Sequence, residues 1–309
     1  MNTPSNANSQ INESQVIAPT VMSASRLMYW SVRRELWENH SIYIAPLAAA
    51  GVFMFGFLIS LTHMANHMRA TFALDPVKQQ AAIEQPYMMV AGLLMLTAML
   101  VGGFYCIEAL HGERRDRSIL FWKSLPVSDL TTVLAKISIP VVVLQLLAFA
   151  VAFAVQLIVL LLTTAVLLGS GLSVATMWSQ LPFFQMAAML LYHLVILHGL
   201  FHAPFYAWLL MVSSWARRAP FLWAVLPPLV LGIAEKIAFN TSYFANMLLS
   251  HLAGGPWSPF AEPSGAMAGM LGHFEPGKLL STLELWTGLA ATAIFLAAAV
   301  RLRRDQGPI

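Results

Sequence analysis

The chain has 309 residues, of which 58% are hydrophobic and only 10% are charged, and its formal net charge at pH 7 is +3. Soluble domains carry about 25% charged residues, so this composition lies well outside the soluble range and indicates a membrane protein. The single cysteine, Cys106, excludes an intramolecular disulfide and a multi-cysteine metal site.

The first 40 residues divide into two parts. Residues 1–22 are rich in Asn, Ser, Gln and Thr and lack the basic start and apolar core of a signal peptide, so we expect a disordered cytosolic tail. Residues 23–40 repeat apolar side chains at helical spacing, with tryptophan and arginine beside them, which is typical of an amphipathic helix in the membrane interface. The alternative is a cytosolic extension of the first span.

Six apolar stretches follow, and each approaches or exceeds the 20 or so residues that a spanning helix needs. They are residues 41–62, 87–108, 138–168, 185–215, 221–239 and 282–300. We therefore predict an all-α membrane protein with a six-span domain over 41–304 and a cytosolic tail at 305–309. Pro204 predicts a kink in the fourth span. The segment 240–281 is apolar but broken by Gly and Pro, and predicts short helices at the outer face.

The distribution of Lys and Arg predicts the orientation, because short cytoplasmic loops retain these residues. Thirteen of them lie on the side of the two termini and three lie on the other side, while Lys236 falls inside a span. Both termini and the loop between the second and third spans are therefore predicted to be cytoplasmic.

That loop contains a charge cluster followed by four large apolar residues, in the sequence HGERRDRSILFWKSLPVSD. Adjacent apolar groups outside the bilayer must be covered. We predict a short helix around 113–123 that inserts apolar side chains into a soluble partner and surrounds them with a charged rim. The apolar residues are Ile119, Leu120, Phe121 and Trp122; the rim is Glu113, Arg114, Asp116 and Arg117. The alternative is a helix resting on lipid headgroups.

Two groups of titratable residues inside the spans are candidates for a transport pathway. His198 and His202 are four residues apart and share a helical face, as metal or haem ligands would. Glu235 and Lys236 are adjacent opposite charges in the fifth span, where charge requires compensation. The alternatives are histidines bonded to neighbouring helices and a structural ion pair.

Other motifs give weaker signals. His63 and His67 repeat the four-residue spacing at the outer end of the first span, where a solvated helix end explains them equally well. The sequence GHFEPGKL at 272–279 has the spacing of a phosphate-binding loop, but Leu279 occupies the position that would hold magnesium. We therefore expect no nucleotide site in this chain. The sequence has no Gly-x-Ser-x-Gly, no His-Glu-x-x-His and no carboxylate pair at catalytic spacing, so we expect no catalytic centre either.

The sequence resembles the membrane subunits of bacterial ABC exporters in the type-2 permease superfamily, which includes Wzm-like and ABCG-like transporters. The likeness lies in ERRDRSILFWKSLPVSDLTTVLAK and in APFYAWLLMVSSWARRAPFLWAVLPPL. It also extends to the layout of helices over residues 23–304. His198 and His202 stand where the family has aromatic or small residues. This departure leaves open a substrate preference that is peculiar to this chain.

This resemblance implies a coupling helix that docks on a separate ATP-binding subunit, which holds ATP and magnesium. It implies two copies of that subunit and a second permease copy, as a homodimer or a related heterodimer, in the bacterial inner membrane. The partners are then proteins and lipid, without nucleic acid, and the chain carries no metal or cofactor of its own. The path between the permeases would be lined by the second and fifth spans.

The expected cargo is amphipathic, such as a peptide antibiotic or a lipid-like molecule, and it moves out of the cytoplasm. Two other functions remain open. One is a histidine-using intramembrane metal or haem protein or enzyme, and the other is a membrane anchor that signals through an ATPase without moving cargo.

Overall fold

The structure, a computed structural model, describes residues 23–125, 127–253, 282–307 and 309. Within these residues all secondary structure is helical, and six helices are long and apolar enough to cross a membrane. The prediction of an all-helical multi-pass membrane protein is therefore confirmed. The predicted tail at 1–22 and most of the predicted outer helices, at 254–281, lie outside the described residues.

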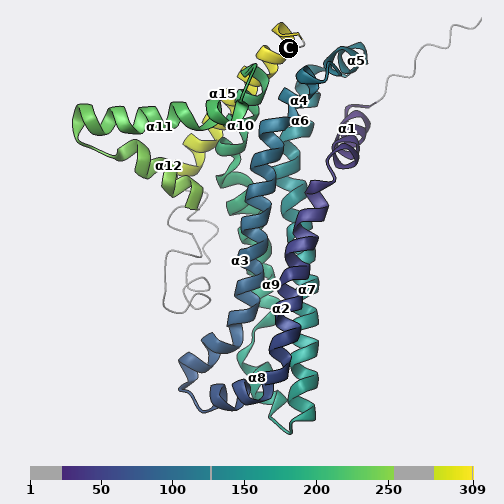
Figure 1. The fold of residues 1–309 in the computed structure, drawn as a ribbon, viewed down its shortest axis with the longest axis vertical. Helices are drawn as coiled ribbons and strands as arrows, with labels where there is room; N and C mark the ends of the chain where they lie inside the picture. Colours follow the sequence, from purple (N-terminus) through teal and green to yellow (C-terminus); the bar gives the residue numbers. More distant parts are fainter. Residues whose placement is uncertain (1–22, 126, 254–281, 308) are drawn as a thin grey trace, which may run out of the picture.

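Three long helices form the shaft of the molecule (Figure 1). They are α2 (Ser41–Phe72), α3 (Pro76–Ala109) and α7 (Leu144–Gly169), which pack against one another. At one end of the shaft lie α8 (Val174–Gln180) and then α9 (Phe183–Tyr192). We call this the α8 end. Because α2 and α3 have 32 and 34 residues, they must tilt in a bilayer or project beyond it.

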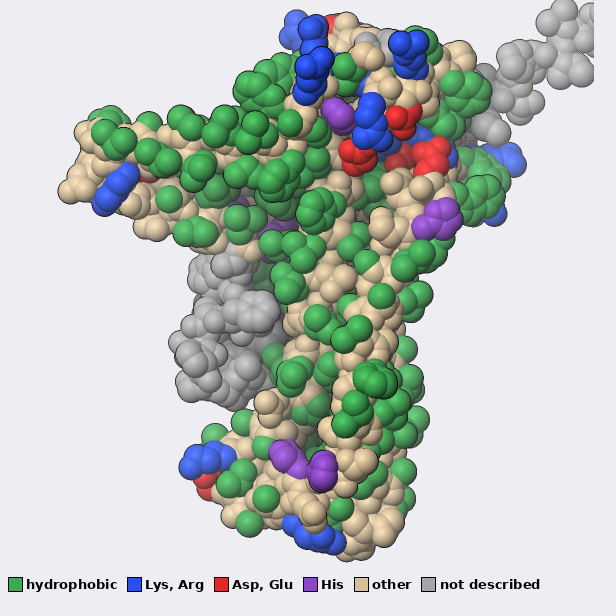
Figure 2. Space-filling view, in the orientation of Figure 1, with side chains coloured by type: hydrophobic (Ala, Val, Ile, Leu, Met, Phe, Trp, Pro, Cys, Tyr) green, Lys and Arg blue, Asp and Glu red, His purple; other side chains and the backbone are tan. Residues whose placement is uncertain are grey.

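Apolar side chains cover both the inside and the outside of the shaft. Ala98, Ala148 and Val159 are fully buried between helices, whereas Val52 and Phe104 are mostly exposed. Helices with apolar side chains on both sides are unstable in water but suited to lipid. Lipid solvates the apolar surface, and it requires the backbone N–H and C=O groups to be hydrogen-bonded within each helix. Figure 2 shows hydrophobic side chains along this surface, with charged side chains concentrated beyond it.

The other end of the molecule, which we call the charged end, is formed by short helices and by the C-terminal helix. These are α1 (Ala24–Glu38), α4 (His111–Arg115), α5 (Ile119–Ser124), α6 (Asp129–Ser138) and the last turns of α15 (Leu283–Asp305). Both α1 and α15 pack against α6. Segments far apart in the sequence thus meet at one end of the shaft (Figure 1).

Two π-helical segments lie side by side within the bundle: η1 (Ile139–Val143) and η2 (His193–Phe201). Gly199 permits their close approach, because an added Cβ would lie 2.7 Å from the carbonyl oxygen of Val141. The sequence predicted a kink at Pro204 in the fourth apolar stretch. The departure from α-helical geometry is instead the π-helical segment η2, which ends before Pro204.

The final elements form an arm. After η2, α10 (Ala203–Trp215) packs along α15; α11 (Pro220–Phe239) then leaves the bundle sideways and α12 (Tyr243–Ala253) returns beneath it (Figure 1). Ala219 makes this turn in the left-handed conformation, with φ 48°. The fifth apolar stretch thus forms a helix of spanning length, but it lies across the shaft. Ala224 is its one buried residue.

Candidate functional site

A network of buried charges joins four helices at the charged end. Lys136 of α6 lies at its centre, with Nζ 2.9 Å from Glu35 Oε1 of α1 and 3.0 Å from Glu113 Oε1 of α4. Arg303 of α15 donates from Nη1 to Glu113 and from Nε to Asp129 Oδ1, the latter at 3.0 Å. We call these five residues the ion cluster. Except for the partly exposed Asp129, each is more than nine-tenths buried.

Further contacts fix the Glu35 carboxylate. The Tyr105 hydroxyl donates to Glu35 Oε2 at 2.8 Å, and the Arg34 guanidinium donates to Oε1. Burial alone would raise the pKa of Glu35, but the adjacent Lys136 and Arg34 outweigh burial and lower the pKa to about 2. Glu35 is therefore ionised at neutral pH, and the cluster holds α1 against α6 by charge-assisted hydrogen bonds.

The segment predicted as a single helix over 113–123 forms two short helices. Arg117 separates α4 from α5 in the left-handed conformation, with φ 59°. Helix α4 is bound to the end of α10, since Arg114 Nη1 donates to the carbonyl oxygens of Ser214 at 2.7 Å and Ala216 at 3.3 Å. These carbonyls lie in and just after the last turn of α10, where the helix itself offers no donor.

Three residues predicted to meet a partner are instead buried within the chain. Ile119 is 1% exposed, and Glu113 and Arg114 are 8% and 4% exposed. The prediction of a rim that includes Glu113 and Arg114 was wrong. Glu113 lies between the buried Lys136 and Arg303 and is a counter-charge to both, in addition to Glu35 and Asp129. Arg114 satisfies the end of α10.

The remaining predicted residues form an exposed apolar ridge. Leu120 and Phe121 are 59% and 58% exposed, while Trp122 is partly buried with its ring 4.0 Å from the Arg34 guanidinium carbon. We call Leu120, Phe121 and Trp122 the α5 ridge. Asp116 and Arg117 are exposed in the turn before it. The α5 ridge thus combines an apolar surface with charged neighbours, as a protein-docking site does.

Helix α5 is also joined to the C-terminal segment. Lys123 Nζ donates to the carbonyl oxygens of Arg304 at 3.3 Å and Gln306 at 3.1 Å. The α5 ridge is therefore connected to α1 through the contact between Trp122 and Arg34, and to the end of α15 through Lys123.

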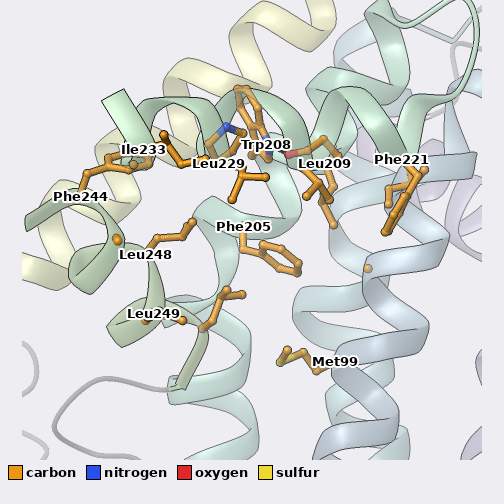
Figure 3. A pocket seen from close by; sticks show the side chains of 18 of the residues that line it. Met99, Phe205, Trp208, Leu209, Phe221, Leu229, Ile233, Phe244, Leu248 and Leu249 are labelled. Atoms are coloured by element: carbon orange, nitrogen blue, oxygen red, sulfur yellow. Dashed lines mark hydrogen bonds between the residues drawn. The ribbon is translucent and has the colours of Figure 1, made fainter. Parts of the chain in front are cut away.

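A second feature is an apolar groove of about 730 Å³ between α3, α10 and the arm (Figure 3). Phe205 and Trp208 reach it from α10, Phe221 and Leu229 from α11, and the indole of Trp208 donates to the carbonyl oxygen of Ala224 at 3.0 Å. A groove with this lining suits an apolar chain or ring.

The four pathway candidates do not meet at one place. Lys236 lines the apolar groove and is exposed. His198 and His202 stack with ring centroids 4.8 Å apart, and His202 also contacts the carbonyl oxygens of Leu197 and Leu252, each at 3.1 Å. Within the described parts of the chain, no hydrogen bond or ion pair joins either histidine to Glu235 or Lys236.

Glu235 binds the start of α12. Its Oε1 accepts from the Thr241 hydroxyl and the Tyr243 N–H, each at 2.7 Å, and its Oε2 accepts from the Phe244 N–H at 2.8 Å. The two N–H groups are free donors of the α12 N-terminus, which a carboxylate satisfies well. Glu235 therefore has a structural role. Its charge is offset by hydrogen bonds from the start of α12, within the arm.

We expect Glu235→Ala to loosen the α11–α12 arm, because three donors lose their acceptor. Glu235→Gln keeps one acceptor oxygen and should have a smaller effect. Hydrogen exchange of the amides at 243–253 measures the difference, and Lys236→Ala serves as the control. Equal exchange in the wild type and in Glu235→Ala would contradict the capping role.

Known proteins offer no guide to the site. Comparisons with protein-family models, with curated proteins and with solved structures gave no match. Within the described residues, no three His, Cys, Asp or Glu side chains come together as a conventional metal site would require. The function must be inferred from the geometry of the charged end and of the groove.

Sequence reasoning missed the ion cluster. Lys136 and Arg303 of the cluster, and the neighbouring Arg34, entered the prediction only among the Lys and Arg residues that mark orientation, and Glu35 did not enter at all. One signal was present: Glu35 lies on the same helical face as Val32, one turn earlier, and a carboxylate on an apolar face needs a buried cation.

Proposed function

We propose that this chain is the membrane permease subunit of an ATP-driven exporter, and that ATP is hydrolysed by a separate subunit that docks on the α5 ridge. The observation that carries this proposal is the pairing of an exposed apolar ridge with a buried ion cluster directly behind it. An apolar ridge outside the lipid layer indicates a surface that a protein partner covers. The ion cluster joins α4, which precedes the ridge, to the ends of α1, α6 and α15.

In this proposal the charged end faces the cytoplasm of a bacterial cell and the α8 end faces outward. The excess of Lys and Arg on the side of the termini supports this orientation. The amphipathic helix α1 then lies at the inner membrane surface, where its exposed tryptophans, Trp30 and Trp37, meet the headgroups.

In this proposal, transport depends on contacts that join helix α5 to α1 and α15. When the ATP-binding subunits close, they move the α5 ridge, and the contacts of Arg34 and Lys123 carry this movement to α1 and α15. The ion cluster makes the four helix ends move together, because separating its charges inside the protein is costly. The permease acts as a dimer with two ATP-binding subunits.

The apolar groove is the proposed binding region for an amphipathic cargo, such as a lipid-like molecule or a peptide antibiotic. Its lining is nearly all apolar, and Lys236 at its rim suits an acidic or polar head. Since α15 and the arm both contact α10 or its flanking segments, movement of α15 changes the space available in the groove.

The α5 ridge is tested by Phe121→Asp in the full chain, purified from native membranes with its copurifying ATP-binding subunit. A charge in a buried contact costs a few kcal/mol, and each 1.4 kcal/mol is tenfold in affinity. We expect at least a tenfold loss of the copurified subunit and of the associated ATP hydrolysis, with the permease still folded.

The matched control is Leu130→Asp, on α6, which has similar exposure at the same end but lies outside the ridge. This variant should keep its partner. If Phe121→Asp retains the same amount of ATP-binding subunit as the wild type, the docking assignment is wrong and the ridge instead rests on lipid.

A further inference from the structure

A second cavity lies at the α8 end of the shaft, at the other end from the charged end, and has no part in the proposed function. It has a volume of about 420 Å³ and is lined by residues of α2, α3, α7 and α8. Met64, Met68 and Met177 line it and are at least nine-tenths buried, while His63 and His67 line it and are exposed. The cavity therefore has thioether walls and an imidazole mouth.

The spacing on α2 places four donor-bearing residues along one cavity. In the sequence HMANHM, at 63–68, the two histidines are four residues apart and so are the two methionines. Residues at this separation are neighbours on a helix, with Cβ atoms about 5–6 Å apart. All four line the same cavity, so two imidazoles and two thioethers of one helical segment converge on one space.

A separate observation indicates that the cavity holds a ligand or water. Tyr87 of α3 lines it and is 2% exposed, yet its hydroxyl has no hydrogen-bond partner among the described residues. Buried hydroxyls without partners are rare in folded proteins. A polar occupant that reaches Tyr87, such as a bound ion with its water, would complete this bonding.

The donor set selects the chemistry. Among the described residues that line the cavity, none is Asp, Glu or Cys, which disfavours calcium and magnesium because these require charged or abundant oxygen ligands. Two histidines alone are too few for a closed zinc site. Thioether and imidazole together suit Cu(I), a soft ion.

We propose that the cavity at the α8 end is a Cu(I) site. Its ligands are His63 and His67 at the mouth and Met64 and Met68 in the wall, and Met89 of α3 lines the same cavity as a further thioether donor. This proposal is independent of the export function and rests on residues at the opposite end from the α5 ridge.

The test is titration of the purified full chain with Cu(I) under reducing conditions, in competition with a chromophoric Cu(I) chelator. We expect one Cu(I) per chain, with sulfur and nitrogen neighbours in its X-ray absorption spectrum. Met64→Leu combined with Met68→Leu keeps the apolar volume but removes both sulfurs, and His63→Ala combined with His67→Ala removes both imidazoles. Each pair should lower the affinity about tenfold or more.

The controls are Met186→Leu with Met189→Leu, which are buried on α9 outside the cavity, and His40→Ala, which is exposed at the charged end. Both should bind like the wild type. If a double variant unfolds, the single variants Met68→Leu and His67→Ala are measured in its place. Absence of stoichiometric Cu(I), unchanged affinity after loss of the sulfurs, or tighter binding of Zn²⁺ at the same site would overturn the proposal.

Discussion

Lys136→Met is expected to destabilise the protein by about 3–5 kcal/mol, because it removes the cation shared by two buried carboxylates. Lys136 Nζ lies 2.9 Å from Glu35 and 3.0 Å from Glu113, and methionine matches the length of the lysine stem without its charge. The measurement is the thermal unfolding temperature of the purified chain in detergent, which should fall by several degrees.

Lys123→Met is the matched control. Lys123 is exposed and bonds to carbonyl oxygens rather than to a buried carboxylate, so its loss should change stability by less than about 1 kcal/mol. A second comparison is the combination of Lys136→Met with Glu35→Gln, which removes one of the stranded charges and should recover part of the loss. Equal unfolding temperatures for Lys136→Met and the wild type would show that the ion cluster contributes little.

Acid should weaken the protein through Glu35. The pKa of Glu35 falls from its ordinary value of 4.5 to about 2 in the folded chain, so the unfolded chain binds a proton at a higher pH than the folded chain does. The stabilisation, about 3 kcal/mol at 1.36 kcal/mol per pKa unit, is present above pH 4.5 and is lost as the pH falls from 4.5 towards 2. Unfolding temperatures measured from pH 7 to pH 3 give the profile.

Other carboxylates also titrate in this range, so the prediction concerns the difference between two profiles. Glu35→Gln cannot ionise, and its unfolding temperature should fall less steeply below pH 4.5 than that of the wild type. Parallel profiles would mean that Glu35 is not the source of the acid sensitivity, even if both proteins unfold in acid.

The sequence predicted the helices well because a membrane imposes a simple requirement on length and polarity. Six stretches met it, and each corresponds to a helix long and apolar enough to span. The arrangement was harder to predict, because side chains facing lipid and side chains facing another helix are both apolar. Phe104 is 64% exposed and its neighbour Tyr105 is 6% exposed. The more polar of the two is the buried one, so hydrophobicity does not indicate which side chain faces another helix.

The direction in which α11 leaves the bundle could not be predicted from the sequence either. Its composition suits a spanning helix, but its placement depends on the left-handed turn at Ala219 and on the bonds of Glu235 to α12. Both features depend on local backbone geometry and on specific hydrogen bonds, and the periodicity of apolar residues indicates neither. The same limit applies to the charged end. The three residues of the α5 ridge stand together in the sequence, whereas the partners of Glu113 are about 20, 79 and 190 residues away along the chain.

The paired segments η1 and η2 have a consequence for how this chain tolerates insertions and deletions. A π-helical turn holds one more residue than the α-helical turn it replaces, and one residue corresponds to about 100° of rotation around a helix axis. Removing a single residue from η2 would thus regularise the backbone, yet rotate all of α10 and turn Trp208 and Tyr206 onto the wrong faces. Shortening η2 should therefore be more damaging than most single substitutions in it, even though it improves the local hydrogen bonding.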